Sequence, residues 1–450
     1  MPPLHRRSVL RAIGAVSTGF VAGCNASPDQ STSSPLPTTG EPTTDADQSG
    51  TSPTATDTST PTDTQTPTET SAPAFSGEPG PLPDATWPLS YRGMTNGSYA
   101  PDGPRFDRDP VVEWRIEEPV TGEQESFDPR LTHPVIADGH LYTTKKLTHG
   151  PNQAAPEQHY LLSFDAASGT ERWRQPIREG PAFKFPTAPA VRGQTVLVGH
   201  DRVLRAHATE TGEERWRRDL GEPIYAIYPT ADRIYVRAHR SIYGLGLDGT
   251  VTWSTELDNH PEDLVLGTRN LYVGASRRLR TLNPETGDRR WDRTLPATNA
   301  YGIRRLLTVD GGVFVLQHSG DLYTFDDTGQ PAWRPDGSFG AMSTDGGRLY
   351  ASAEGVLRCF SVAGGTQVWE LQCTDLEGCD SARYVGKPVL TDAVVYVPID
   401  GSLLAAVDPD DGAVRWSLTT ERDVPRITLG QNGIYSIGDY ERSITKRVAA

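Results

Sequence analysis

From about residue 130 to the C-terminus, short apolar segments alternate with turns that contain glycine. Pro134–Thr143 shows the pattern, because an apolar strand leads to Asp138 and Gly139 and a second apolar strand follows. An Asp-Gly or Asn-Gly pair between two such segments predicts a β-hairpin, since these residues accept the backbone conformation of a tight turn. Asp345–Ala351 and Asn432–Ser436 repeat the arrangement.

A second hairpin follows within each repeat, and it carries a glycine four residues before a tryptophan. In Leu162–Trp173 an apolar strand ends at Asp165, a turn contains Gly169, and the outgoing strand holds Trp173. The aspartate can bond the backbone of its own turn, and glycine supplies the positive φ. The indole then offers a broad face to a neighbouring sheet. The motif occurs seven times: Gly169 and Trp173, Gly212 and Trp216, Gly249 and Trp253, Gly287 and Trp291, Gly329 and Trp333, Gly365 and Trp369, Gly412 and Trp416.

The tryptophans give the repeat length. From Trp114 to Trp416 the successive gaps are 59, 43, 37, 38, 42, 36 and 47 residues. A period near 40 with four strands in each repeat is typical of β-propeller blades. The sequence therefore predicts an all-β fold made of four-stranded antiparallel blades.

The number of blades follows from the two ends of the repeat region. Val111–Ile116 holds Trp114 without the strands that should precede it, whereas three strand-like segments after Trp416 lack a tryptophan strand. Joining them completes an eighth blade and closes the ring with N- and C-terminal strands. We therefore predict eight blades, with seven as the alternative if Trp114 belongs only to the segment that leads into the ring.

The repeat resembles that of the quinoprotein-type, or PQQ-like, β-propellers, which has the form Asp-x-x-Thr-Gly-x-x-x-Trp. The resemblance covers about residues 87–450, and Trp87–Gly93 is similar to the opening segment of such proteins. The family includes dehydrogenases that hold pyrroloquinoline quinone and usually Ca²⁺ on the ring axis. It also includes non-enzymatic scaffolds, such as the lipoprotein propeller of bacterial outer-membrane assembly.

The resemblance by itself does not separate these functions. The compact repeats favour the scaffold class, because the dehydrogenases usually carry long insertions. The chain also has no Cys-Cys pair and no Cys-x-x-Cys-His haem motif. We expect a binding or scaffold module with no catalytic residue, no metal and no cofactor. The alternatives are a dehydrogenase that uses the quinone and Ca²⁺, and a surface sensor or glycan-binding module.

The N-terminus predicts export and a lipid anchor. Arg6 and Arg7 precede a weakly apolar run, Ala12–Gly23, that is too short to span a bilayer. Adjacent arginines before such a run indicate a twin-arginine signal. Cys24 follows small residues as in a lipobox, so residues 1–24 are expected to be a lipoprotein signal with Cys24 as the lipidated residue. The alternative is a plain signal peptide with a chance cysteine.

Residues 25–86 are predicted to be a disordered tether. Residues 31–70 contain 15 Thr, 6 Ser and 6 Pro. Such a segment buries too little apolar surface to offset the entropy lost on ordering. The propeller, residues 87–450, would then stand off the outer face of the cytoplasmic membrane.

The charge of the chain limits its partners. The net charge is -15, which disfavours nucleic acid by repulsion. Lysine occurs only five times among 43 basic residues, and this acidic, lysine-poor composition is typical of a salt-adapted organism; a halophilic archaeon is the best match. We expect a monomer that binds an unidentified protein or an anionic ligand and meets the membrane through its lipid.

Two further groups of residues bear candidate chemistry. Cys373 and Cys379 have the spacing of a local disulfide, with Cys359–Cys373 as the competing pair. The default ligand site of a propeller is the axial funnel, where the innermost strands converge. Cations and aromatic residues near the expected starts of those strands would suit an anionic ligand there; they are Lys184, Tyr225, Arg304, Arg305, Arg383, Lys387 and Arg426.

Overall fold

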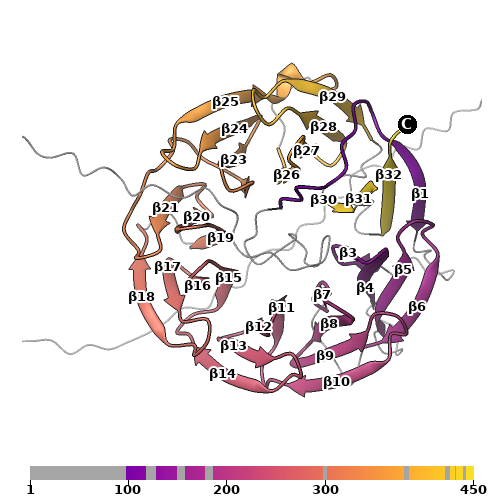
Figure 1. The fold of residues 1–450 in the computed structure, drawn as a ribbon, viewed down its shortest axis with the longest axis vertical. Coiled ribbons are helices and arrows are strands. Elements are labelled where there is room, and N and C mark those ends of the chain that lie inside the picture. The colour runs from indigo at the N-terminus through magenta and orange to yellow at the C-terminus, as the bar shows by residue number, and fades with distance from the viewer. Residues whose placement is uncertain are drawn as a thin grey trace, which may run out of the picture. The chain divides into compact units, whose positions relative to one another are not determined.

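The computed structural model describes residues 98–117, 128–148, 158–177, 186–296, 302–379, 385–420, 426–430, 432–438 and 442–450. All of them lie in one unit, residues 69–450. Within these ranges the chain forms eight antiparallel sheets that follow one another around a ring (Figure 1). The eight-bladed propeller predicted from the tryptophan period is therefore confirmed. The predicted signal, tether and opening segment around Trp87, as well as Cys24, lie outside the described residues.

Blades one to four take up the first half of the ring. Blade one contains β2 (Asp128–Leu131), β3 (Val135–Ala137), β4 (His140–Thr148), β5 (Gln158–Asp165) and β6 (Glu171–Pro176). Blade two contains β7 (Ala190–Arg192), β8 (Thr195–His200), β9 (Val203–Ala208) and β10 (Glu214–Asp219). Blade three contains β11 (Ile224–Pro229), β12 (Arg233–Ala238), β13 (Ser241–Gly246) and β14 (Val251–Glu256). Blade four contains β15 (Pro261–Leu266), β16 (Leu271–Ala275), β17 (Arg278–Leu282) and β18 (Arg289–Thr294).

Blades five to eight complete the ring. Blade five contains β19 (Ile303–Val309), β20 (Gly312–Gln317) and β21 (Leu322–Asp326). Blade six contains β22 (Ala341–Thr344), β23 (Arg348–Ala353), β24 (Val356–Ser361) and β25 (Gln367–Gln372), which the 3-10 turn η1 (Cys373–Asp375) follows. Blade seven contains β26 (Val389–Leu390), β27 (Val395–Ile399), β28 (Leu403–Val407) and β29 (Val414–Thr419). Blade eight contains β30 (Arg426–Gly430), β31 (Gly433–Gly438), β32 (Ser443–Val448) and β1 (Val111–Glu117).

The strand order defines two faces of the propeller. Each blade runs outward from the axis as an antiparallel meander, so its innermost strand starts, and its outermost strand ends, on the same side. We call this side the connection face, because the chain crosses there from one blade to the next. The opposite side, the turn face, carries the hairpins between first and second strands and between third and fourth strands.

The repeat glycines and tryptophans hold neighbouring blades together. A Cβ atom placed on each of the seven glycines would lie 2.4–3.0 Å from the indole of the preceding blade, and all seven have φ between 70° and 84°. Most of the indoles also donate to a turn carbonyl of the next blade; Trp369 Nε1, for example, donates to Pro409 O at 3.0 Å. Glycine is thus required twice, for its backbone angle and for the close approach of the ring.

Blade five departs from the regular pattern. Its expected fourth strand is reduced to a single bridge between Phe325 and Pro331. Pro331 and Pro335 have no N–H to donate to a ladder, so a strand around Trp333 cannot continue. Trp333 nevertheless reaches blade six, where its Nε1 donates to Val362 O at 2.7 Å. The contact between blades is kept although the strand is lost.

Both ends of the propeller close the ring. β1 pairs antiparallel with β32, so the outermost strand of blade eight comes from the opposite end of the fold from the other three. This is the closure that the isolated Trp114 segment predicted.

Residues 98–109, the segment before β1, connect blade seven to blade eight, and we call this segment the strap. It replaces the turn that blade eight lacks between its third and fourth strands. Phe106 O accepts from Trp416 Nε1 at 2.8 Å, and Pro104 O accepts from the Tyr396 hydroxyl at 2.7 Å. Near the axis, Ala100 N donates to Leu390 O at 2.7 Å. Figure 1 shows the strap as the indigo segment that runs outward over blade seven to β1.

The cysteines lie in blade six. Cys373 and Cys379 form a disulfide, the pairing that the sequence favoured over Cys359–Cys373. Cys359 is a free, fully buried thiol on β24. Within the described ranges, no helix is long and apolar enough to cross a membrane.

Candidate functional site

Five of the seven funnel candidates can be placed in the structure. Tyr225 lies on β11, Arg304 and Arg305 lie on β19, Lys387 lies two residues before β26, and Arg426 is the first residue of β30. Each is at or near the start of an innermost strand, so all five are on the connection face. Lys184 and Arg383 lie outside the described residues.

Three of these residues share one electrostatic environment. Burial is the largest cause that lowers the pKa of Lys387 well below its usual value; Arg305 adds to this shift, and Asp263 opposes it. Arg305 and Asp263 come from blades five and four, whereas Lys387 leads into blade seven. The ring therefore brings cations from distant parts of the sequence to the axis. We call Arg305, Lys387 and Arg426 the axial cation group.

His133 connects this group to blade one. Burial is the main cause that lowers the pKa of His133 to about 3, with further contributions from Arg426 and Lys387; the Pro134 carbonyl opposes them. Its Nδ1 lies 3.2 Å from the hydroxyl of Thr428 on β30. His133 is therefore neutral at ordinary pH. Burial contributes most to this low pKa, and the positive charge of Arg426 contributes next.

Asp263 is a carboxylate that acts on Lys387 and that the sequence analysis missed. It is buried, and its Oδ2 accepts from Leu306 N at 2.9 Å, which ties blade four to blade five. Burial is the main cause that raises the pKa of Tyr228 to about 12; Asp263 raises it further, while Arg237 and Arg305 oppose the shift. The sequence did offer one signal: Asp263 stands at a buried position next to the apolar residues Leu264, Val265 and Leu266 of β15.

Tyr225 belongs to a separate aromatic cluster. Its ring centroid lies 4.6 Å from that of His260 and 6.2 Å from that of His239. Arg237 lies over the Tyr225 ring, 5.7 Å from the centroid. Arg304 is half-buried on β19, next to Arg305 in the sequence. The predicted funnel set therefore divides into a cationic group and an aromatic one.

The axial residues fit the quinone and the calcium of dehydrogenases unequally. The axial cation group has the charge to meet the carboxylates of pyrroloquinoline quinone. Ca²⁺ needs six to eight oxygen ligands, rich in carboxylates. Among the described residues, no group of three or more His, Cys, Asp or Glu side chains could hold a metal ion. The charge of the axial cation group therefore suits an anion.

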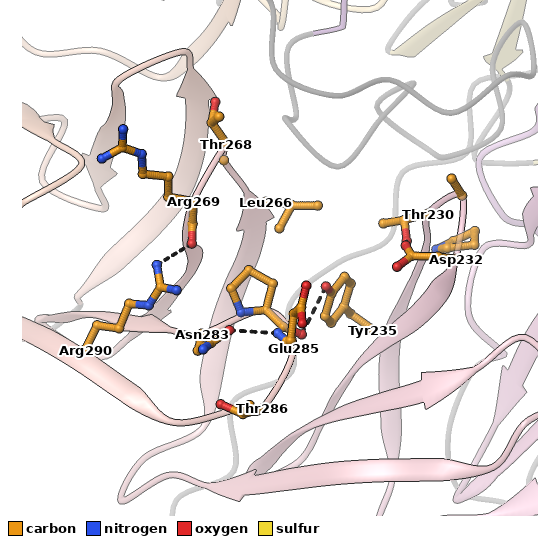
Figure 2. A pocket seen from close by; sticks show the side chains of 14 residues that line it. Thr230, Asp232, Tyr235, Leu266, Thr268, Arg269, Asn283, Glu285, Thr286 and Arg290 are labelled. Atoms are coloured by element: carbon orange, nitrogen blue, oxygen red, sulfur yellow. Dashed lines mark hydrogen bonds between the residues drawn. The ribbon is translucent and has the colours of Figure 1, made fainter.

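A cavity lies on the opposite, turn face. Its volume is about 620 Å³, and it opens between blades three and four. Figure 2 shows Leu266 near its centre, with Arg269 on one side and Tyr235 and Asp232 on the other. Nothing in the sequence pattern pointed to it, because its walls come from turns of two different blades.

Comparison with known proteins identifies the repeat. The family model described as outer membrane protein assembly factor BamB matches residues 157–306 and 302–428. A search of curated proteins found no match.

Solved structures share the propeller fold at low sequence identity. BamB from Moraxella catarrhalis superimposes with a TM-score of 0.54 and 17% identity, over 76% of this chain and 98% of that one. The quinohemoprotein alcohol dehydrogenase ADHIIG from Pseudomonas putida HK5 gives 0.58 and 12%, over 81% and 80%. The computationally designed Ika8 protein gives 0.58 and 14%, over 72% and 98%. An assembly-factor structure, an enzyme and a designed protein all match at 17% identity or less, so these likenesses concern the fold alone.

Proposed function

We propose that this chain, which belongs to the outer membrane protein assembly factor BamB family, is a non-catalytic binding propeller held at the outer face of the cytoplasmic membrane. Its ligand is an anion, either a small molecule or an acidic segment of a protein. The binding site is the connection face at the ring axis.

The observation that carries this proposal is the convergence of Arg305, Lys387 and Arg426. Burial and Arg305 lower the pKa of Lys387, and Lys387 and Arg426 in turn lower the pKa of His133, so cations from three blades act on the same axial region. Asp263 raises the pKa of Lys387, and this carboxylate also accepts a hydrogen bond from Leu306 N at 2.9 Å. An anion would relieve the repulsion, so binding energy is available at this position.

The dehydrogenase is the competing function, and it has less support. The cations would meet the carboxylates of the quinone, but the described residues contain no cluster of three or more His, Cys, Asp or Glu side chains that could hold a metal ion. The compact repeats and the lack of a Cys-Cys pair also separate the chain from quinoprotein dehydrogenases. We derive no oxidation step for this protein.

Titration with an acidic probe tests the proposal. A fluorescein-labelled pentaglutamate peptide should bind the full-length protein, and Lys387→Gln or Arg305→Gln should raise its Kd about tenfold, since each change removes roughly 1.4 kcal/mol of charge-assisted bonding. Arg202→Gln is the matched control, because Arg202 is exposed and paired with Asp219 at 3.1 Å. Fluorescence anisotropy measures the Kd values.

A second titration separates binding from catalysis. Purified protein is mixed with pyrroloquinoline quinone and Ca²⁺ and assayed for dye-linked alcohol oxidation. Tight binding with turnover would replace our proposal with the dehydrogenase. If the acidic probe does not bind, or if the Lys387→Gln variant binds it equally well, the axial cation group is not the binding site.

The membrane anchor has its own prediction. Cys24→Ser removes the thiol that would carry the lipid, so the protein should move from the membrane fraction to the medium. Ala22→Ser is the control, since it changes a neighbouring small residue and keeps the thiol. Fractionation followed by immunoblotting measures the distribution. Continued membrane retention of Cys24→Ser would contradict lipidation at this position.

A further inference from the structure

Two buried histidines meet at the seam, the interface between blades one and two. His159 lies on β5 of blade one and is 1% exposed, and His200 ends β8 of blade two and is 3% exposed. Nδ1 of His159 lies 2.5 Å from Nε2 of His200, and the two ring planes are at 86° to each other. At this separation one imidazole donates its N–H and the other accepts, so the two facing nitrogens share one proton.

The histidine pair lies on the connection face, where β5 starts and β8 ends. On the same side of the seam, Thr144 Oγ1 donates to Thr187 O at 3.1 Å. The turn-face side is held differently, because Trp173 Nε1 donates there to Thr209 O at 2.8 Å. The seam is thus joined by two imidazoles on one side and by an indole, which does not titrate, on the other.

Neither histidine is required by the repeat. The carbonyl of His159 accepts from the residue that follows the fourth strand, and in blades two and three the exposed Arg202 and Arg240 make this same bond. His159 is buried instead because β5 is eight residues long and extends the ladder past this position. His200 is the last residue of a second strand, where blades three, four and six end in alanine: Ala238, Ala275 and Ala353. The imidazole pair is therefore a property of this one seam.

The surroundings of the pair oppose additional positive charge. Lys146 is the register partner of His159 on β4, so both side chains lie on the same side of blade one, and Lys146 is 7% exposed. Burial and a neighbouring cation both disfavour an imidazolium at this position. The other charged residues of the adjoining strands and turn are Arg130, Lys145, Asp201, Arg202 and Asp219, of which Arg202 and Asp219 pair with each other at 3.1 Å.

We propose that His159 and His200 form an acid-sensitive latch, and that blades one and two separate at the connection face when both rings are protonated. A doubly protonated pair places two N–H groups and two positive charges face to face, so the hydrogen bond between the rings is lost. Trp173 keeps the turn-face side joined, so the separation is a local hinge motion of the seam. This inference does not rest on the proposed anion site.

The direction of the pH effect follows from the number of protons bound. The closed pair accepts at most one additional proton, whereas the open pair accepts two. The population of the open seam therefore rises by about tenfold per pH unit, or more, as the pH falls below about 6.5, the ordinary pKa of histidine. Above that pH the latch is closed.

Hydrogen–deuterium exchange of the full-length protein measures the opening. Amide exchange of β5 and β8 is followed from pH 7.5 to pH 5.0 in buffer with EDTA, and each rate is divided by the intrinsic rate at the same pH. The resulting opening constant should rise about tenfold or more over this range. The seam between blades six and seven, followed through β24 and β27, is the internal reference. It holds Gly355 and Ile399 at the corresponding positions, so its opening constant should change less than about threefold.

Two amide variants remove the titration and keep a hydrogen bond. His159→Asn places an amide near the position of Nδ1, and His200→Gln places one near the position of Nε2. Each should reduce the pH effect at the seam to less than about threefold, because the remaining imidazole bonds to the amide in either protonation state. His207→Asn is the matched control, since His207 is also buried in blade two but its Nδ1 lies 2.9 Å from Gly212 O. It should keep the wild-type pH effect. Melting temperatures at pH 7.5 show that each variant is folded, and the comparison of two seams in the wild type stands without the variants.

Several results would overturn the latch. The two seams could show the same pH dependence, or both amide variants could keep the wild-type profile. A reduced pH effect in His207→Asn as well would assign the opening to buried imidazoles in general. The exchange is also repeated with Zn²⁺ in place of EDTA; if the seam at pH 7.5 is protected only with Zn²⁺, a metal ion rather than a shared proton joins the two rings.

Discussion

Replacing Trp369 by alanine is expected to lower the free energy of unfolding by about 4 kcal/mol, as for other buried tryptophans. Trp369 is only 7% exposed, packs on Tyr350 at a centroid distance of 5.8 Å, and donates to Pro409 O. It joins blades six and seven, so its loss leaves a cavity and an unpaired carbonyl between them. Urea unfolding followed by circular dichroism measures the change.

The glycine partner makes this prediction specific. A Cβ on Gly412 would lie 2.8 Å from Trp369, at a φ of 78°. Gly412→Ala should therefore cost about 3 kcal/mol in the native chain, through overpacking and backbone strain together. In the Trp369→Ala background only the strain of about 1 kcal/mol remains. The two changes should be clearly non-additive.

Val368→Ala is the control for Trp369. Val368 precedes Trp369 on β25 and is 48% exposed, so its truncation should change stability by no more than about 0.5 kcal/mol. Additive effects of Trp369→Ala and Gly412→Ala would show that the indole does not pack on the glycine.

Removing the strap is expected to have the second large effect. Deletion of residues 1–109 keeps β1 but removes Phe106 and the carbonyl partners of Trp416 and Tyr396. Phe106 is 5% exposed. Burial of one phenylalanine and two hydrogen bonds together predict a loss on the order of 5 kcal/mol. Thermal unfolding and limited proteolysis measure the stability of the ring.

A point variant separates the strap from the rest of the deleted segment. Phe106→Ala should cost about 3 kcal/mol, whereas Asp107→Ala, the next residue and largely exposed, should cost no more than about 0.5 kcal/mol. Equal effects of the two substitutions would mean that the strap does not seal the gap between blades seven and eight.

The fold could be predicted because each repeat contains the glycine and tryptophan that pack it against its neighbours. The glycine and tryptophan of one repeat act on the adjacent one, so spacing along the chain translates directly into packing between neighbours. Even the closing blade was visible, since Trp114 lacked preceding strands. The missing strand of blade five was not predicted, because Pro331 and Pro335 break the ladder while Trp333 keeps its place in the motif.

The candidate site was predictable only in part. The positions of Arg305, Lys387 and Arg426 at strand starts were sufficient to bring them to one face. Their grouping, and the roles of Asp263 and His133, depend on which blades meet across the axis, and this requires the closed ring. The turn-face cavity was missed for a similar reason, because its walls come from turns of two neighbouring blades.

The closure of blade eight also affects when this protein can fold during synthesis. Blades one to seven are each made from one continuous stretch, so they can form in order as the ribosome releases them. β1 emerges first but waits for β32, several hundred residues later, which is on the order of tens of seconds at ordinary translation rates. During that interval β1 lacks its strand partner, and unpaired strands can pair with other chains. The topology therefore postpones pairing of the first strand of the propeller until the last strand has been made.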